Sequence, residues 1–349
     1  MRKILVVDFN GTSSVYTHYL AKGLININDE VKILGKKKPE FLDVFNDLNK
    51  YIGIKSGIKL IDYILNWIWL LFNYNKFDVI IIQWLQLLKY INLEVRLINY
   101  LQKRIKLVYI LHNLYPHNTK NIKIINRYNQ LYTTCKNIAI HTEKIKNKVF
   151  ELNPKANLLK VNHGFFFEEF REFSTNIKNN RCLMIGYISK YKGVEDALKV
   201  VENLKQKGII VSLEIIGLAS PEYLLKLVNL IEKLQIKDQV SILSKEVSTR
   251  FLIDKINTAS MLWLPYKNIS QSGVTYTSIG LGKPFVGYDV GNFKFFFGDK
   301  GVARIVDKDN IESFSKGVIE VMNNESYYKE NIQKLSLNNL WELNKSIIN

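Results

Sequence analysis

The segment at residues 270–291, SQSGVTYTSIGLGKPFVGYDVG, indicates how the second half of this chain folds. It follows an apolar run at residues 261–265, which has the length and composition of a buried strand. A helix is predicted over residues 274–281, because Gly282 and Pro284 form a pair that ends helices. A second strand is predicted over residues 285–288. The segment therefore predicts a strand–turn–helix–strand unit of an α/β sheet.

The turn before that helix is the part of the segment best suited to bind a ligand. Gln271, Ser272 and Gly273 are small or polar, and with Val274 they lie at the expected helix N-terminus. The N–H groups there point outward and the helix adds partial positive charge, so a phosphate or a sugar hydroxyl fits the place. The same residues also fit an ordinary turn of an α/β sheet. A single glycine-containing turn is weak evidence for a ligand site.

Length and composition predict a globular protein of two domains. The chain has 349 residues, more than one hydrophobic core usually holds, and 47% of them are hydrophobic. Its two cysteines, Cys135 and Cys182, lie in apolar segments, where free thiols in a reducing compartment are expected. The N-terminal apolar run is too short for a signal peptide, and no apolar run is long enough to predict a membrane span.

The basic charge of the chain is unevenly distributed. The net charge is +17, and residues 1–165 hold 25 Lys and Arg against 11 Asp and Glu. Residues 166–349 hold 24 against 21, so the basic excess lies almost wholly in the first half. Such asymmetry predicts an anionic partner for that half, namely a membrane surface, a polyphosphate lipid or nucleic acid. A general lysine bias of the genome is the alternative, but it would affect both halves equally.

The first half alternates between predicted strands and helices, which is typical of a parallel sheet with helices on both faces. Strands are predicted over residues 4–7, 31–34, 79–82, 107–111 and 137–141. Ligand sites in such sheets lie at the carboxyl ends of the strands. The polar residues expected at that edge are Asp8, Asn10, Gly11, Ser14, Gln83, His112, Asn113 and His141.

A helix predicted over residues 58–74 is apolar nearly all round. Trp67, Trp69 and Phe72 lie within it, and lysines flank both ends. One interpretation is an interfacial helix that rests its aromatic side on lipid, with its basic ends near anionic headgroups. The alternative is a buried helix of the first domain.

The second half starts a new α/β pattern after a polar junction at residues 162–175. Strands are predicted over residues 182–185, 211–216 and 240–243, with helices over 194–207 and 222–234. We therefore predict two Rossmann-like, doubly wound α/β domains with a cleft between them. The predicted domains are residues 1–166 and 172–325, followed by a C-terminal segment at residues 326–349.

Five segments, in this order and spacing, resemble those of one enzyme family. They are Asn10-Gly11-Thr12-Ser13-Ser14, Leu111-His112-Asn113 through His117, His163-Gly164, Lys190-Tyr191-Lys192-Gly193-Val194, and residues 270–291. Together they are similar to a glycosyltransferase of the two-Rossmann-domain (GT-B) type, most like glycosyltransferase family 4. The resemblance extends in pieces over nearly the whole chain. It implies that residues 326–349 form a helix that crosses back to the first domain.

The resemblance implies a role for each of these segments. It places His112 at the reacting carbon of a donor sugar, as the catalytic residue. It implies that Lys192 contacts the donor diphosphate, and the other donor-binding candidates are Lys190, Gln271, Ser272, Gly273, Val274 and Thr277. The N-terminal loop contributes Asn10, Gly11 and Ser14. Asn113, His117, His163 and Asp8 are further candidates of lower rank.

The chain departs from the family pattern at three positions. Tyr187 stands where the family often has an arginine that contacts the diphosphate. Ile269 and Thr277 stand where family members commonly have two glutamates, in a Glu-x7-Glu arrangement, that hold the donor sugar and ribose. The departures imply altered donor contacts or a homologue that binds without catalysis.

The implied function is transfer of a sugar from a nucleotide-sugar donor to a lipid-linked or growing glycan. No cofactor or metal is expected, and the donor substrate is a UDP-sugar first and a GDP-sugar second. Nucleotide-sugar epimerase or phosphorylase activity on the same fold is the alternative. A nucleic-acid partner is not expected, because no recognition motif accompanies the positive charge. The expected location is cytoplasmic, peripheral on the inner face of the plasma membrane.

Overall fold

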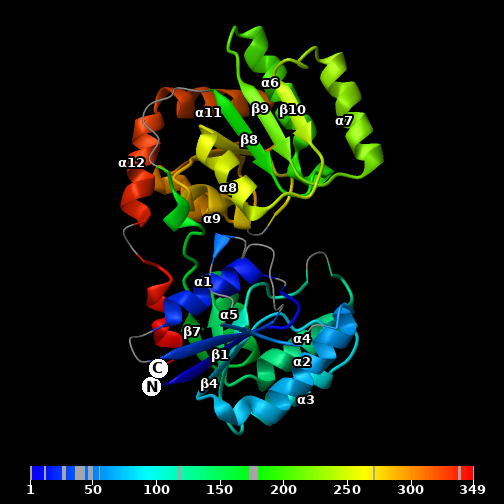
Figure 1. Ribbon diagram of the computed structural model, residues 1–349, viewed down its shortest axis with the longest axis vertical. Helices are drawn as coiled ribbons and strands as arrows, with labels where there is room; N and C mark the ends of the chain where they lie inside the picture. The colour runs from blue at the N-terminus through cyan, green and yellow to red at the C-terminus, as the bar shows by residue number, and fades with distance from the viewer. Residues whose placement is uncertain are drawn as a thin grey trace. The chain divides into compact units, whose positions relative to one another are not determined.

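The computed structural model describes residues 2–11, 13–25, 29–35, 44–45, 50–54, 56–116, 119–172, 180–269, 272–336 and 339–348. The chain divides into two compact units (Figure 1). The first unit is Met1–Gly164 together with Asn339–Asn349, and the second is Phe165–Asn338.

The first unit is built on a parallel sheet whose order, over the described residues, is β3-β2-β1-β4-β5-β6-β7. The strands are β1 (Lys3–Asp8), β2 (Glu30–Gly35), β3 (Tyr51–Ile52), β4 (Val79–Ile82), β5 (Lys106–Leu111), β6 (Asn137–Ile140) and β7 (Asn157–Lys160). The helices are α1 (Ser14–Leu24), α2 (Lys59–Asn73), α3 (Leu93–Leu101), α4 (Ile122–Thr134) and α5 (Glu143–Leu152). All four residues of β4 are fully buried, as expected for a strand covered on both faces.

The second unit has a parallel sheet of order β10-β9-β8-β11-β12-β13 within the residues that the structure describes. Its strands are β8 (Arg181–Ile185), β9 (Ser212–Ile216), β10 (Val240–Leu243), β11 (Met261–Leu264), β12 (Phe285–Tyr288) and β13 (Ala303–Val306). Its helices are α6 (Val194–Gln206), α7 (Pro221–Lys233), α8 (Thr249–Thr258), α9 (Gly273–Gly280), α10 (Phe293–Phe297), α11 (Ile311–Asn323) and α12 (Glu325–Ser336), and Figure 1 shows α6 and α7 beside β8–β10.

Both sheets confirm the predicted fold of two Rossmann-like domains. Renumbered within its unit, the second sheet has the order 3-2-1-4-5-6, and the first has the same order with one further strand. In such sheets the chain changes direction between strands 1 and 4, and ligands bind beside the carboxyl ends at that switch point. The switch points here lie between β1 and β4 and between β8 and β11.

The C-terminal segment differs from the predicted crossing helix over residues 326–349. The helix α12 ends at Ser336 and belongs to the second unit, and only Asn339–Asn349 returns to the first. Trp341 is 5% exposed and packs against Tyr16 at 5.3 Å between ring centroids. A Cβ on Gly164 would come within 2.3 Å of its indole ring, so a glycine is needed for this contact.

The helix α2 has one buried face and one exposed face, so neither simple interpretation of its sequence is right. The prediction that Trp67 faces lipid is wrong, since this side chain is 4% exposed and its indole N–H donates to the carboxylate of Glu94. The outward face consists of other apolar side chains. It consists of Leu60, Ile61, Ile64, Ile68 and Phe72, which are 42–80% exposed.

Candidate functional site

The switch point of the second unit brings a buried lysine and a buried tyrosine together. Strand β8 leads to Gly186, and the turn η6 (Lys190–Lys192) follows, while β11 leads to Tyr266. The ammonium Nζ of Lys192 donates to the phenol oxygen of Tyr266 at 2.8 Å. Lys192 is 8% exposed, and both side chains line a small hollow together with Gly186 and Tyr187. This hollow is at the edge where the sequence predicted a donor site.

A glycine after the lysine fixes this arrangement. Gly193 has φ of +71°, a conformation that side-chain-bearing residues rarely adopt. A Cβ at this position would lie 1.8 Å from the carbonyl oxygen of Pro265, so the turn can pack against the end of β11 only with glycine. The backbone N–H of Lys267 then donates to the carbonyl of Tyr191 at 2.7 Å, which ties the two switch-point segments together.

The electrostatic state of Lys192 follows from its burial. Removal from water lowers the pKa of its ammonium group to about 8. Within the described ranges this lysine forms no ion pair. The nearby Lys267 instead pairs with Asp196 and Asp309. Lys192 is therefore a cation that an anionic ligand would stabilise.

The N-terminus of α9 joins the same site. The side chain of Ser272 bonds the phenol oxygen of Tyr266, and the serine makes no cap bond to its own helix. The first N–H groups of α9 therefore remain without an intrahelical partner. Gly273, Val274 and Thr277 lie on the accessible side of the helix, while residues 275, 276, 278 and 279 are buried. Tyr266 thus connects two segments that the sequence predicted separately.

Other residues proposed for the donor site lie differently or outside the described part. Lys190 is exposed and does not line the hollow, although it begins the same turn. Gln271 and His117 lie outside the described residues. The hollow includes Tyr187, which is 58% exposed where the family often has an arginine.

The switch point of the first unit contains the N-terminal loop. Asp8 is 1% exposed, and its carboxylate accepts the backbone N–H of Ser13 at 3.0 Å. Gly11, with φ of +64°, donates its backbone N–H to the carbonyl of Asp8, and the hydroxyl of Ser14 donates to the carbonyl of Gly11. Asn10 donates to the side chain of Gln86 at 2.7 Å. The carboxylate of Asp8 therefore holds this loop in place.

His112 lies at the end of β5, beside β4. Its Nε2 lies 2.8 Å from the Oε1 atom of Gln83, and its ring stacks on Trp84 at 4.5 Å with an angle of 5° between planes. Burial, together with His141 and His163, keeps the pKa of His112 well below its ordinary value. The imidazole is therefore neutral at physiological pH.

Two further histidines surround Tyr16 at the same edge. The rings of His112, His141 and His163 lie 4.8, 5.6 and 5.2 Å from the ring of Tyr16, measured between centroids. Burial lowers the pKa of His141 to about 4 and that of His163 to about 3. His163 also contacts the carbonyl oxygen of Gly164 through Nδ1, which is consistent with a structural turn. Asn113 follows His112 and is half-buried.

Sequence reasoning missed Tyr16, Trp84 and Tyr266. A signal existed for Tyr266, because it is the second residue after a buried strand and so lies at the functional edge. Trp84 also follows a strand, but nothing in the sequence indicates its left-handed backbone, with φ of +44°.

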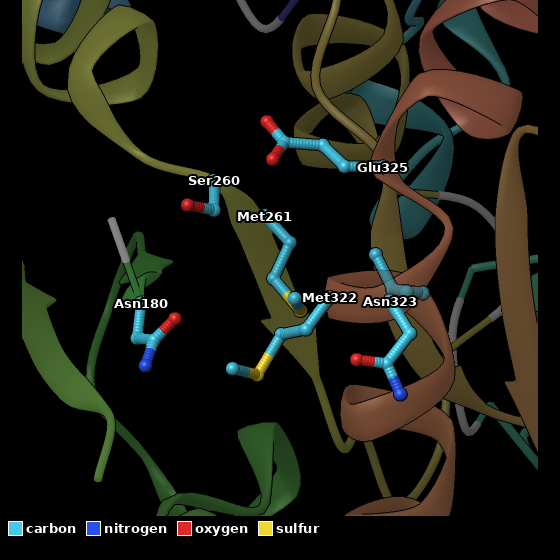
Figure 2. A pocket seen from close by; sticks show the side chains of 7 residues that line it. Asn180, Ser260, Met261, Met322, Asn323 and Glu325 are labelled. Carbon is cyan, nitrogen blue, oxygen red and sulfur yellow. The ribbon is translucent and has the colours of Figure 1, made fainter. Parts of the chain in front are cut away.

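A second hollow lies at the opposite edge of the second sheet. Asn180 precedes β8, Ser260 precedes β11, Met261 begins β11, and Met322 and Glu325 come from α11 and α12 (Figure 2). Figure 2 shows the Met261 and Met322 side chains together there. Because this edge holds the amino ends of the strands, the hollow is separate from the switch point. No group of three or more His, Cys, Asp or Glu side chains within the described ranges is placed to hold a metal ion.

Comparison with known proteins finds one family model that is similar to the second unit. Residues 166–335 match the family described as Glycosyl transferases group 1. A curated relative from Haemophilus influenzae, named "Uncharacterized glycosyltransferase", is 25% identical over 235 residues. That alignment covers 65% of this chain and 65% of the relative's length.

Several solved structures share the fold of the chain. HepE of Anabaena in complex with UDP-glucose has a TM-score of 0.71 at 11% identity, covering 99% of this chain and 98% of HepE. A glycosyltransferase from Rickettsia africae has a TM-score of 0.71 at 14% identity, covering 99% and 97%. Sucrose-phosphate synthase from Thermosynechococcus elongatus has a TM-score of 0.69 at 11% identity, covering 100% and 95%. Together with the family match, these likenesses support a glycosyltransferase of GT-B fold.

Proposed function

We propose that this protein transfers a sugar from a nucleotide-sugar donor to a lipid-linked or growing glycan. A UDP-sugar is the first candidate donor and a GDP-sugar the second. The observation that carries the proposal is the contact of Lys192 with Tyr266 and of Tyr266 with Ser272, at a switch point inside the matched domain. HepE, which shares the fold, was solved with UDP-glucose, and this supports the choice of a UDP-sugar.

The chemistry of such a transfer fits the charges of the site. When the sugar leaves, negative charge grows on the diphosphate oxygen of the donor. A preorganised cation and helix N-terminal N–H groups stabilise that charge more strongly in a buried site than in water. Lys192 and the first turn of α9 supply these groups, so we assign Lys192, Ser272, Gly273 and Val274 to the diphosphate. Thr277 is proposed to contact the ribose through its hydroxyl, in place of the missing glutamate.

We propose that the first unit contacts the reacting sugar and the membrane on which a lipid-linked acceptor lies. We assign His112 to the sugar at the reacting carbon. The exposed stripe of Ile61, Ile64, Ile68 and Phe72 on α2, in the half with the basic excess, suits a bilayer surface with anionic lipid. No helix in the described part of the chain is long and apolar enough to cross a bilayer. We therefore propose peripheral association with the inner face of the plasma membrane.

Ile269 and Thr277 stand where the family commonly has two donor-binding glutamates, so alternative functions are also considered. A nucleotide-sugar epimerase, a phosphorylase or a binding homologue without catalysis would use the same diphosphate contacts. These alternatives differ in their products, so product analysis separates them.

Incubation with UDP-glucose, UDP-N-acetylglucosamine and GDP-mannose, with and without a bacterial glycolipid fraction, tests the proposal. We expect release of nucleoside diphosphate that depends on the glycolipid, and appearance of the sugar in the lipid phase. Isomerised nucleotide-sugar without acceptor would favour the epimerase, and phosphate-dependent formation of a sugar phosphate would favour the phosphorylase. Binding without any product would favour the non-catalytic homologue.

A further inference from the structure

A chain of hydrogen bonds runs from the buried carboxylate of Asp8 to the imidazole of His112. The hydroxyl of Thr17 lies 3.1 Å from the Oδ2 atom of Asp8. The side-chain amide nitrogen Nε2 of Gln83 donates to that hydroxyl at 3.0 Å. The Oε1 atom of Gln83 then lies 2.8 Å from Nε2 of His112. Asp8, Thr17 and Gln83 are each at most 1% exposed, so water does not compete for these bonds.

The carboxylate sets the direction of this chain. A carboxylate accepts hydrogen bonds and does not donate them, so the Thr17 hydroxyl directs its proton toward Asp8 or toward the carbonyl of Ser13, 3.0 Å away. A lone pair of the Thr17 hydroxyl oxygen then faces Gln83, so Gln83 must direct its side-chain NH₂ group toward it. The amide oxygen of Gln83 is left facing His112, and only a protonated Nε2 can bond it.

Trp84 holds the imidazole in the plane that this bond requires. Its ring is nearly parallel to that of His112. Its backbone lies in the left-handed region with φ of +44°, a conformation that costs roughly 1–3 kcal/mol for a non-glycine residue. Tyr16 contacts the imidazole edge-on at 4.8 Å between centroids. The contacts with Trp84, Tyr16 and Gln83 thus fix the ring.

We propose that Asp8, Thr17 and Gln83 fix His112 as the neutral tautomer with its proton on Nε2. This assignment rests on the proposed function, in which His112 contacts the sugar. Nδ1 then carries a lone pair, and no group within the described residues bonds it. His112 therefore accepts a hydrogen bond from a sugar hydroxyl and cannot donate one through this nitrogen. Gln83 is a positioning residue, since it acts only through His112.

The tautomer can be measured without any substrate. The full-length protein is labelled with ¹⁵N-histidine, and the ring nitrogens of His112 are assigned by the loss of one of five histidine signal sets in His112→Asn. We expect Nδ1 to resonate as an unprotonated nitrogen and Nε2 as an N–H nitrogen at pH 7.5. A protonated Nδ1 would overturn the proposal.

Two variants test the origin of the tautomer. Gln83→Leu and Thr17→Val remove the acceptor and the orienting hydroxyl, so both should give a mixture of tautomers, whereas the exposed-site control Lys103→Gln should match wild type. Gln83→Leu should also lower kcat by about 10–100-fold with little change in KM. An unchanged single tautomer in both variants would contradict the proposal.

The tautomer measurement and the sugar-transfer assay can fail independently of each other. If a variant does not fold, the wild-type spectrum alone decides the tautomer. If the spectrum is as expected but no sugar transfer occurs with any donor, the proposed function fails and the tautomer assignment stands.

Discussion

The ammonium group of Lys192 lies 2.8 Å from the phenol oxygen of Tyr266, and the lysine side chain is buried. Burial alone lowers its pKa to about 8. The proton is therefore held below pH 8 in the free protein and lost as the pH rises through that value. A bound diphosphate favours the protonated form, because an opposite charge at close range offsets the cost of desolvation. Binding of donor and protonation of Lys192 thus support each other.

We predict an alkaline limb in the pH profile of kcat/KM. The value should fall as the pH rises through about 8, by up to about tenfold per pH unit, since kcat/KM reports groups of the free enzyme. In Lys192→Arg the limb should move to higher pH, because a guanidinium stays charged. The measurement is kcat/KM from pH 6 to 10 with one donor. An identical alkaline limb in wild type and Lys192→Arg would show that another group titrates.

Single residues were predictable from the sequence where a motif marks them. Lys192 and Ser272 follow such motifs, and the structure links both to Tyr266. Trp84 could not be predicted, since its left-handed backbone depends on packing around His112. Which ring nitrogen of His112 faces Gln83 could not be predicted either, because it depends on how β4 and β5 pack in the folded protein.

At the scale of the element, α2 combines two roles in one helix. Tyr63, Trp67 and Leu70 pack into the core of the first unit, and Glu94 accepts hydrogen bonds from the first two. The stripe of Ile61, Ile64, Ile68 and Phe72 lies on the other side, since its spacing returns to one face of a helix. The sequence of α2 is therefore apolar nearly all round because one face packs into the core and the other is an exposed apolar face.

We predict that the stripe binds anionic lipid. Ile64→Glu with Phe72→Glu should lower co-sedimentation with phosphatidylglycerol vesicles about tenfold or more, because each change adds a charge and removes apolar contact. Leu225→Glu on α7, an equally exposed aliphatic site of the second unit, is the matched control and should bind as wild type does. Equal binding by all three proteins would contradict membrane docking through α2. Near-native circular dichroism is required of each variant.

Most helices and strands were predictable because their periodicity is local. The bounds of β4, β10 and β12 agree with prediction, while β3 and β7 were missed. β3 has only two residues, and β7 is partly exposed and carries polar residues at both ends, so neither shows an apolar run. The orientation of α2 was not predictable, because Trp67 looks the same in sequence whether it faces Glu94 or lipid.

At the scale of the whole molecule, the two units share one strand order but differ in charge. The sequence predicted the two Rossmann-like domains from strand–helix alternation, and the strand orders confirm them. The predicted cleft between the domains and the roles of the site residues stay predictions. Donor identity was not predictable, because Ile269 and Thr277 replace the residues by which the family resemblance would indicate it.

The central claim is that the second unit binds a nucleoside diphosphate through Lys192. A thermal-shift panel of UDP, GDP and their sugars, applied to wild type, Lys192→Ala and the exposed α6 control Lys199→Ala, tests it directly. At 100 times Kd a ligand adds about 2.7 kcal/mol, so the preferred nucleotide should raise Tm by several degrees in wild type and in Lys199→Ala. The shift should be lost in Lys192→Ala at the same concentration. An equal shift in Lys192→Ala, or no shift in wild type with any nucleotide of the panel, would contradict the account.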